Sequence, residues 1–253
     1  MKNLVFLGSR DISAKYLRYL IDQSHKLNYQ IVAALTRKTQ TDIIDLCKTK
    51  NIKVLNSLDD YLGIERVDIA VSIQYHLILR RPHLAKARQA TLNLHMAPLP
   101  EYRGCNQFSF AIINEEKTFG TTFHLMEEGI DSGDIVCERR FHIPEGCWVK
   151  ELYDPTEHHS SGMFQEFLPR LIAKEYTLMS QDLLRTERDM PSYKRKDVEA
   201  VKNIDLNWSQ EQIKKHIRAT SMPGYSPPYT IISTRKIEFI PELTKKIILP
   251  IKS

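Results

Sequence analysis

The sequence has few cysteines, and none of them is arranged for metal binding. Four occur in 253 residues, without a CxxC pair or another spacing typical of zinc ligands: Cys47, Cys105, Cys137 and Cys147. The sequence also contains no HExxH motif, and its carboxylates do not follow the spacing of an EF-hand loop. These absences predict a protein without a metal centre, whose reduced thiols fit a cytoplasmic location.

Long apolar runs are also missing. No stretch reaches the roughly 18 apolar residues that a membrane-spanning helix needs, so we expect no membrane association. The N-terminal apolar run, residues 4–7, stops at Gly8 and is followed by Ser, Arg and Asp. This run is therefore predicted to be a buried first strand rather than a secretion signal.

Charge of one sign is in small excess, and only in the C-terminal part. The net charge is +5, whereas residues 1–185 contain 23 basic and 23 acidic side chains. From residue 186 onward, 13 Lys and Arg stand against 8 Asp and Glu. This excess is too small for a nucleic-acid-binding surface. It fits either a site for one or two phosphate groups or an ordinary solvated face.

The first half of the chain alternates short apolar runs with amphipathic stretches. Strands are predicted at residues 4–7, 30–35, 52–55, 67–73, 90–95 and 119–126. Helices are predicted after the first strand, after Thr41 as a cap, from Ser57 onward, and near residues 83–87. This alternation is typical of an α/β fold, with a Rossmann-like, open, mostly parallel sheet and helices on both faces.

The last quarter predicts a small subdomain made of a helix and a β-hairpin. The helix is expected at residues 210–219 with Ser209 or Asn207 as its cap, and the hairpin at 229–233 and 236–240. Residues 247–249 are a candidate edge strand that a partner would need to cover. We therefore expect a catalytic domain at residues 1–185 and a C-terminal subdomain at 186–253.

Glycine is scarce where a dinucleotide site would need it. That fingerprint requires three glycines, GxGxxG, because the backbone must approach a pyrophosphate closely. The turn after the first predicted strand, residues 8–13, has the sequence GSRDIS and contains one glycine. A nicotinamide-dependent enzyme is therefore not expected.

Polar side chains gather at the end of the strand predicted at 90–95. Asn93 and His95 are two residues apart, so their side chains project from the same face. An amide donor beside an imidazole can stabilise a developing oxyanion and accept a proton. A polar edge strand with two hydrogen-bonding residues is the alternative interpretation.

A second polar segment follows the strand predicted at 119–126. It is a loop with glycines and four carboxylates, Glu127, Glu128, Asp131 and Asp134. A carboxylate from this loop could orient His95 and increase its basicity. His124 lies within a strand that has a buried pattern, so we interpret it as structural.

Together, these segments resemble the folate-dependent formyltransferase superfamily, which includes methionyl-tRNA formyltransferase and glycinamide ribonucleotide formyltransferase. The resemblance rests on Asn93-Leu94-His95, on the sequence PLPEYRG at residues 98–104, and on the pattern H-x-M-x-x-x-x-D-x-G-x-I at residues 124–135. It covers the whole chain, most clearly residues 60–145.

The resemblance implies catalytic roles for Asn93, His95 and Asp131, and 10-formyltetrahydrofolate as the formyl donor. It implies that the pterin of the folate lies near the strand at 67–73 and the loop after it. Tyr75 and Leu77 would flank the folate there, and Asp131 would contact it as well.

Within the superfamily, residues 93–108 are most similar to the sugar-nucleotide N-formyltransferases, which formylate amino-dideoxy sugars on dTDP or GDP for bacterial O-antigens and other surface glycans. The chain length argues against the tRNA enzyme, and so does the loop Ala97-Pro98-Leu99-Pro100, where that enzyme has Ser-Leu-Leu-Pro. The implied acceptor is dTDP-4-amino-4,6-dideoxyglucose, with dTDP-3-amino-3,6-dideoxyhexoses and GDP-perosamine as alternatives. A formyltetrahydrofolate hydrolase and a non-catalytic sugar-nucleotide binder are the alternatives of other classes.

The resemblance also suggests which residues contact the sugar nucleotide, and how the chain assembles. The expected substrate contacts are Tyr102, Arg103, Gln107, Tyr193, Lys194 and Lys196. The basic and aromatic residues near 193–196 suit a pyrophosphate and a base. Relatives dimerise through such a C-terminal element, so a homodimer through this region is expected, without nucleic acid or membrane as a partner.

Overall fold

The computed structural model describes residues 1–184, 188–189 and 191–241. These residues form two compact units, and each unit combines segments that are distant in the sequence. The first unit contains residues 1–103, 120–140 and 157–191, and the second contains residues 104–119, 141–156 and 192 onward.

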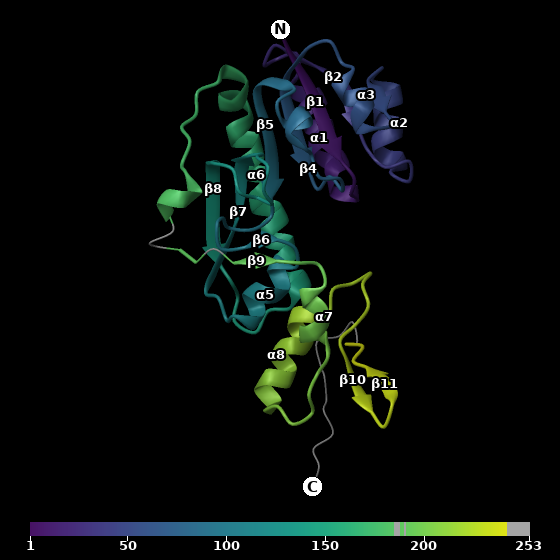
Figure 1. The fold of residues 1–253 in the computed structure, drawn as a ribbon, viewed down its shortest axis with the longest axis vertical. Coiled ribbons are helices and arrows are strands. Elements are labelled where there is room, and N and C mark those ends of the chain that lie inside the picture. Colours follow the sequence, from purple (N-terminus) through teal and green to yellow (C-terminus); the bar gives the residue numbers. More distant parts are fainter. Residues whose placement is uncertain (185–187, 190, 242–253) are drawn as a thin grey trace. The chain divides into compact units, whose positions relative to one another are not determined.

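The first unit is built on a seven-stranded sheet with the order β3-β2-β1-β4-β5-β7-β8 (Figure 1). Its strands are β1 (Lys2–Gly8), β2 (Tyr29–Leu35), β3 (Lys53–Leu55), β4 (Val67–Ile73), β5 (Ala87–His95), β7 (Thr118–Leu125) and β8 (Ile135–His142). The pairs among the first five strands are parallel, whereas β7 runs antiparallel to β5. Every residue of β4 is buried, as expected for a central strand that is covered on both faces.

Helices cover both faces of this sheet. One face carries α1 (Asp11–Gln23), α2 (Thr41–Thr49) and α6 (Val149–Ala173), and the other carries α3 (Leu58–Leu62) and α4 (Arg81–Leu84). The side chains along β1 alternate between the two faces and so divide the core. Leu4 and Phe6 pack with the first group of helices, whereas Val5 and Leu7 pack with the second group. The predicted open, mostly parallel sheet with helices on both faces is confirmed.

Aromatic packing fixes β7 against the long helix α6. The ring of Phe123 in β7 meets Phe164 and Phe167 of α6 edge to face, at centroid distances of 5.8 and 5.5 Å. All three rings are buried, and full burial of one such side chain stabilises the fold by about 1.5–3 kcal/mol. This contact holds β7 in place, and β7 carries residues described below as part of the site.

The second unit consists mainly of short elements. They are α5 (Gln107–Ile113), β9 (Ser192–Tyr193), α7 (Asp197–Lys202), α8 (Gln210–Thr220), β10 (Tyr229–Ile232) and β11 (Arg235–Glu238). Ile204, Ile213 and Ile217 form a small core, and β10 pairs with β11 as an antiparallel hairpin. Two further short elements are β6 (Arg103–Gly104), which pairs with β9, and the 3₁₀ helix η1 (Gln181–Leu184) of the first unit.

Gly104 is required where β6 meets β9. Its backbone has φ +91, and a Cβ atom there would lie 2.2 Å from the Tyr193 carbonyl oxygen. The amide of the next residue, Cys105, donates to that same carbonyl at 2.9 Å. Only glycine allows both the positive φ and this close approach of the two backbones.

Most predicted elements are present, with small shifts at their ends. The second helix begins at Thr41, so Gln40 is the N-cap rather than Thr41. Ser209 caps α8 by accepting from the Gln212 amide, which selects it over Asn207. The candidate edge strand at 247–249 lies outside the described residues. Among the helices of residues 1–184, 188–189 and 191–241, none is apolar over a length that could cross a bilayer.

Candidate active site

The candidate site lies at the end of β5, where this strand pairs with β7. In the antiparallel register, Asn93 stands opposite His124, and His95 stands opposite Thr122. The predicted pair on β5 therefore faces an imidazole from the neighbouring strand. All of these residues belong to the first unit.

His95 is held by a backbone carbonyl. Its side chain is 7% exposed, and its Nε2 lies 2.7 Å from the Tyr102 carbonyl oxygen. A carbonyl oxygen can only accept, so Nε2 carries the proton and Nδ1 is the basic nitrogen of the neutral ring. This Nδ1 lies 3.6 Å from Asp131 Oδ2. The geometry thus leaves the proton-accepting nitrogen of His95 beside a carboxylate.

His124 is oriented in a similar way by its own strand. Its Nδ1 donates to the Leu125 carbonyl at 2.7 Å, and its Nε2 accepts from Asn93 Nδ2 at 3.2 Å. The same Nε2 lies 3.5 Å from Asp131 Oδ1, and the side chain is 2% exposed. The sequence suggested a structural role for His124, whereas the structure places its imidazole against Asn93 and Asp131.

Asp131 lies between the two imidazoles. Its backbone has φ +52, a left-handed conformation that aspartate tolerates better than most residues. The side chain is 14% exposed. A carboxylate at these distances attracts the positive charge that either ring gains when it accepts a proton. Asp131 can therefore stabilise a proton transferred to His95.

Buried hydroxyl groups hold the two strands in register at the site. Thr121 Oγ1 donates to the His95 carbonyl at 3.0 Å, and Thr122 Oγ1 donates to the Ala97 carbonyl at 2.9 Å. Ser160 of α6 donates in turn to Thr121 Oγ1 at 2.7 Å. These bonds satisfy polar groups that would otherwise be costly to bury, and they fix the backbone of His95.

The assembled groups suit acyl transfer to an amine. The Asn93 amide can donate to an oxyanion, His95 can accept a proton, and Asp131 can stabilise the resulting imidazolium. Within the part of the chain that the structure describes, no group of three His, Cys, Asp or Glu side chains is placed to hold a metal ion.

Besides Asp131, two residues are expected to contact folate, and both lie after β4. Tyr75 is half-buried against the core of α3 and α4, and burial raises its pKa. Its ring meets His76 edge to face, at a centroid distance of 4.9 Å. Leu77 is 45% exposed, which leaves its side chain accessible to a ligand.

The residues expected to contact the sugar nucleotide fall into two groups. Tyr102 and Arg103 belong to the first unit; the Tyr102 side chain is buried, and Arg103 is bound to Gln181. The others belong to the second unit: Gln107, Tyr193, Lys194 and Lys196.

Tyr193 is packed on helix α5. Its ring is stacked on Phe110 at a centroid distance of 4.2 Å, and its hydroxyl accepts from Asn114 at 3.2 Å. Lys194 and Lys196 are both exposed. The structure therefore brings Asn93, His95 and Asp131 together around His124. Four of the six predicted nucleotide contacts belong to the second unit, whereas Tyr102 and Arg103 belong to the first.

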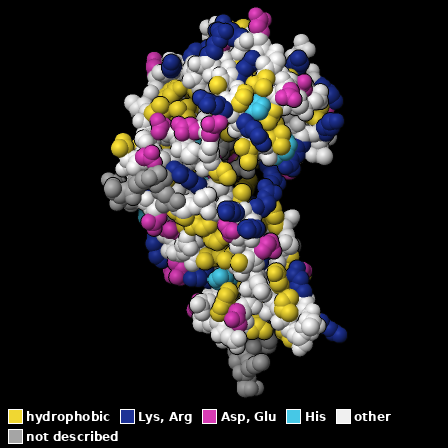
Figure 2. Space-filling model, in the orientation of Figure 1, with side chains coloured by type: hydrophobic (Ala, Val, Ile, Leu, Met, Phe, Trp, Pro, Cys, Tyr) yellow, Lys and Arg dark blue, Asp and Glu magenta, His cyan; other side chains and the backbone are white. Residues whose placement is uncertain are grey.

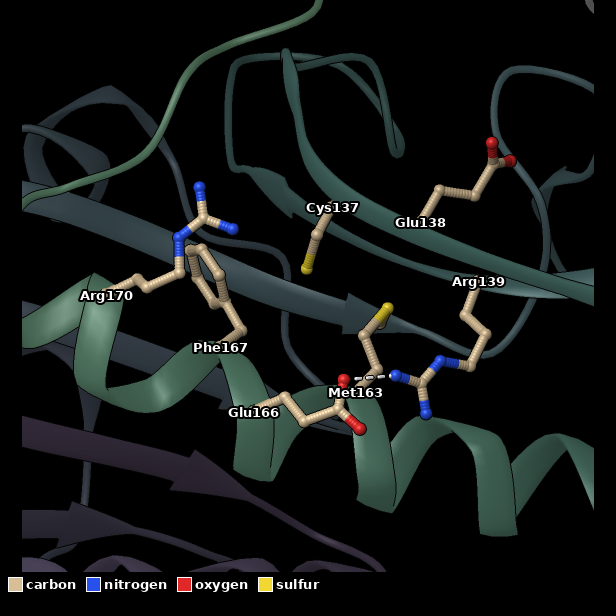
Figure 3. A pocket seen from close by; sticks show the side chains of 7 residues that line it. All are labelled: Cys137, Glu138, Arg139, Met163, Glu166, Phe167 and Arg170. Atoms are coloured by element: carbon tan, nitrogen blue, oxygen red, sulfur yellow. Dashed lines mark hydrogen bonds and ion pairs between the residues drawn. The ribbon is translucent and has the colours of Figure 1, made fainter.

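A separate pocket lies where β8 faces α6 (Figure 3). Its volume is about 170 Å³, and it is lined by Cys137, Glu138, Arg139, Met163, Glu166, Phe167 and Arg170. Burial raises the pKa of the Cys137 thiol to about 12, although Arg170 and Arg139 act against this shift. The thiol is therefore protonated near neutrality, and Arg139 is paired with Glu166. We assign no chemistry to this pocket.

The sequence matches the model of a known family. Residues 20–168 match the family described as formyl transferase. This match spans more than half of the chain, and the chain belongs to the formyl transferase family.

Curated relatives include a polymyxin resistance protein and a GDP-perosamine N-formyltransferase. The bifunctional polymyxin resistance protein ArnA of Wigglesworthia glossinidia brevipalpis is 31% identical over 191 residues, which are 76% of this chain and 28% of that protein. The GDP-perosamine N-formyltransferase of Brucella melitensis biotype 1 is 27% identical over 184 residues, 70% of this chain and 65% of that protein. The chain thus spans less than two thirds of the length of either relative.

Solved structures share the fold over nearly the whole chain. A 4-N formyltransferase from Francisella tularensis has a TM-score of 0.81 at 19% identity, covering 97% of this chain and 99% of that one. An N-formyltransferase from Helicobacter canadensis, in complex with folinic acid and dTDP-3-aminofucose, has a TM-score of 0.76 at 22% identity, covering 94% and 86%. At such identities these likenesses concern the fold.

Proposed function

We propose that this protein transfers a formyl group from 10-formyltetrahydrofolate to the amino group of a nucleotide-linked amino-dideoxy sugar. One observation carries the proposal: Asn93, His95 and Asp131 converge at the strand ends of a formyl transferase family member. Asn93 and Asp131 are 38 positions apart in sequence, yet the β5–β7 pairing and the following loop bring both against His124, at 3.2 and 3.5 Å from its Nε2.

Each residue has a role in this reaction. His95 accepts a proton from the acceptor amine through Nδ1, and Tyr102 holds the ring from the opposite nitrogen. Asn93 donates to the oxyanion formed as the amine nitrogen bonds to the formyl carbon. Asp131 stabilises the imidazolium and assists delivery of the proton to the folate nitrogen when its bond to the formyl carbon breaks.

The donor is supported by both the fold and the loop after β4. The Helicobacter canadensis protein that shares this fold was solved with folinic acid, a formylated folate. Tyr75 and Leu77 are proposed to flank the pterin, and the exposure of Leu77 suits an apolar contact with it.

The acceptor is proposed to be a sugar nucleotide rather than a tRNA. This proposal is supported by the likeness to the Brucella melitensis enzyme and by the fold shared with the Francisella tularensis protein. We propose dTDP-4-amino-4,6-dideoxyglucose, with 3-amino dTDP sugars and GDP-perosamine as the nearest alternatives. Exposed Lys194 and Lys196 are proposed to contact the phosphates, in a cytoplasmic pathway for a bacterial surface glycan such as O-antigen.

A mass-spectrometric assay tests both the reaction and the acceptor. The protein is incubated with 10-formyltetrahydrofolate and a panel of dTDP- and GDP-linked 3-amino and 4-amino sugars. We expect one sugar to gain the mass of one CO, and an equal amount of tetrahydrofolate to form. Folate consumption with release of formate and no modified sugar would identify a hydrolase instead. No consumption with any acceptor would indicate a binding protein.

We also propose that the protein is a homodimer through its C-terminal region. The β10–β11 hairpin exposes three isoleucines, Ile231, Ile232 and Ile237. Figure 2 shows hydrophobic side chains among charged ones on the surface of the second unit. Exposed apolar residues on a hairpin favour burial against a second copy. Light scattering at micromolar concentration is expected to give the dimer mass, and a monomer would refute this assembly.

A further inference from the structure

The side chain of one buried residue, Gln181, bonds the backbone of the loop that carries Asp131. Gln181 begins the 3₁₀ helix η1 and is 2% exposed. Its Nε2 donates to the carbonyl oxygens of Asp131 and Gly133, at 2.9 and 2.7 Å. One amide group therefore fixes the backbone on both sides of Ser132.

Arg103 determines which way this amide points. Its Nε and Nη2 both donate to Gln181 Oε1, at 3.0 and 2.6 Å. A guanidinium has no acceptor, so the oxygen of the Gln181 amide must face it and the nitrogen must face the loop. Two donors from one rigid planar group hold that orientation better than a single donor would.

We propose that Gln181 and Arg103 are positioning residues for Asp131. Arg103 orients the Gln181 amide, and the amide holds Asp131 in its left-handed conformation. The carboxylate is thereby kept 3.6 Å from His95 Nδ1 and 3.5 Å from His124 Nε2. This inference rests on the proposed catalytic role of Asp131, and it requires no contact between Arg103 and a substrate.

Substitution of Gln181 should slow catalysis more than it weakens binding. Gln181→Leu removes both donors but preserves an apolar stem of similar length. The freed loop would let the Asp131 carboxylate shift, and a displacement of about 1 Å at such a group costs about 100-fold in rate. We therefore expect kcat to fall by about 30- to 100-fold, with the KM values for folate and acceptor changing by less than about threefold.

Gln89 provides a matched control elsewhere in the same unit. Its Nε2 donates to the Leu171 carbonyl at 2.6 Å, and its Oε1 accepts from Lys2 Nζ at 2.6 Å. It thus makes the same kinds of bond as Gln181, a carbonyl on one side and a cation on the other. Gln89 lies near the start of β5, six residues before His95 and about 20 Å along the strand. Gln89→Leu should lower the thermal midpoint similarly and leave kcat within about twofold.

A double-mutant cycle separates positioning from a general loss of structure. If Gln181 acts through the Asp131 carboxylate, Gln181→Leu combined with Asp131→Asn should be nearly as active as Asp131→Asn alone. If Gln181 had a merely structural role, the fold-losses in kcat of the two single variants would instead multiply in the double variant. Arg103→Met should reproduce the effect of Gln181→Leu, and Arg103→Lys, which keeps one donor, should restore part of the rate.

The outcomes also separate this inference from the proposed function. An inactive wild-type protein, or an Asp131→Asn variant with full turnover, would refute the proposed function. The positioning role would be overturned if the wild type is active and Asp131→Asn is slow, but Gln181→Leu is no slower than Gln89→Leu. Losses that multiply in the cycle would overturn it as well. If Gln181→Leu does not fold, the Arg103→Lys and Asp131→Asn pair supplies the same cycle.

Discussion

The replacement Gly133→Ala should disable the site through one misplaced methyl group. A Cβ at this position would lie 2.1 Å from the Leu125 carbonyl oxygen and 2.8 Å from the Leu125 carbonyl carbon. Carbon–oxygen contacts rarely fall below about 3.3 Å, so the backbones would have to separate by about 1 Å. Neither atom belongs to a flexible side chain, because Leu125 ends β7 and its amide donates to the Asp134 carbonyl at 2.9 Å.

The shift would propagate to Asp131, two residues earlier in the same loop. We expect kcat to fall by about 100-fold, the usual consequence of a 1 Å displacement of a reacting group. The strain should lower the free energy of unfolding by about 1–3 kcal/mol. For a chain of this size that corresponds to a decrease of roughly 2–12 °C in the thermal midpoint. Tetrahydrofolate formation and thermal unfolding measure the two effects.

Two other glycines serve as controls for this experiment. Gly63 follows α3 with φ −72, and an added Cβ would lie 3.4 Å from the Asp60 carbonyl oxygen and 3.8 Å from that of Asp59, both ordinary contact distances. Gly146 has φ +68 but no atom within 4 Å of an added Cβ, so alanine there introduces backbone strain without a clash. Both alanine variants should turn over at the wild-type rate. A Gly133→Ala protein with normal kcat would refute the reasoning.

Three further predictions concern single groups. Asn93→Ala should lower turnover by hundreds-fold without unfolding the protein, because loss of one oxyanion donor costs about 3–4 kcal/mol; steady-state kinetics and circular dichroism test this. Ser160→Ala removes a buried hydrogen bond to Thr121, so the free energy of unfolding should fall by about 1 kcal/mol while kcat stays within about threefold. Urea titration measures the free energy of unfolding, and an unchanged value would contradict this prediction. Burial raises the pKa of Cys47 to about 11, so its stabilising contribution is complete below about pH 9 and is lost as the pH rises to 11. In the Cys47→Ala variant, the free energy of unfolding should therefore fall by about 2–3 kcal/mol less between pH 9 and 11 than in the wild type. An equal fall in both proteins would refute this assignment.

The sequence was sufficient for features that depend on local patterns. The strand Val67–Ile73 is present with the predicted bounds, because seven residues rich in apolar side chains can hardly form anything else between two helices. Ser209 as a cap follows from its own side chain. The placement of Asn93 and His95 on one strand could be predicted because a two-residue spacing is visible in one segment.

Features that depend on pairing between distant segments could not be predicted in this way. His124 faces Asn93 only because of the β5–β7 register, and nothing in either strand specifies that alignment by itself. Gln181 contacts the Asp131 loop across 50 residues, from a short 3₁₀ helix with no periodic pattern. Both residues are polar and buried, and only the three-dimensional partners show why burial is tolerated there.

The interleaved composition of the two units limits how this protein could change by recombination. The chain passes from one unit to the other five times, after residues 103, 119, 140, 156 and 191. A single crossover between two genes could therefore not exchange one whole unit and leave the other intact, because no contiguous segment of the chain corresponds to the second unit. Helix α5 would be separated from α8, its neighbour in that unit, by an exchange of the C-terminal segment alone. New substrate preferences in this architecture should therefore arise by point substitution and by changes in loop length rather than by shuffling of whole modules.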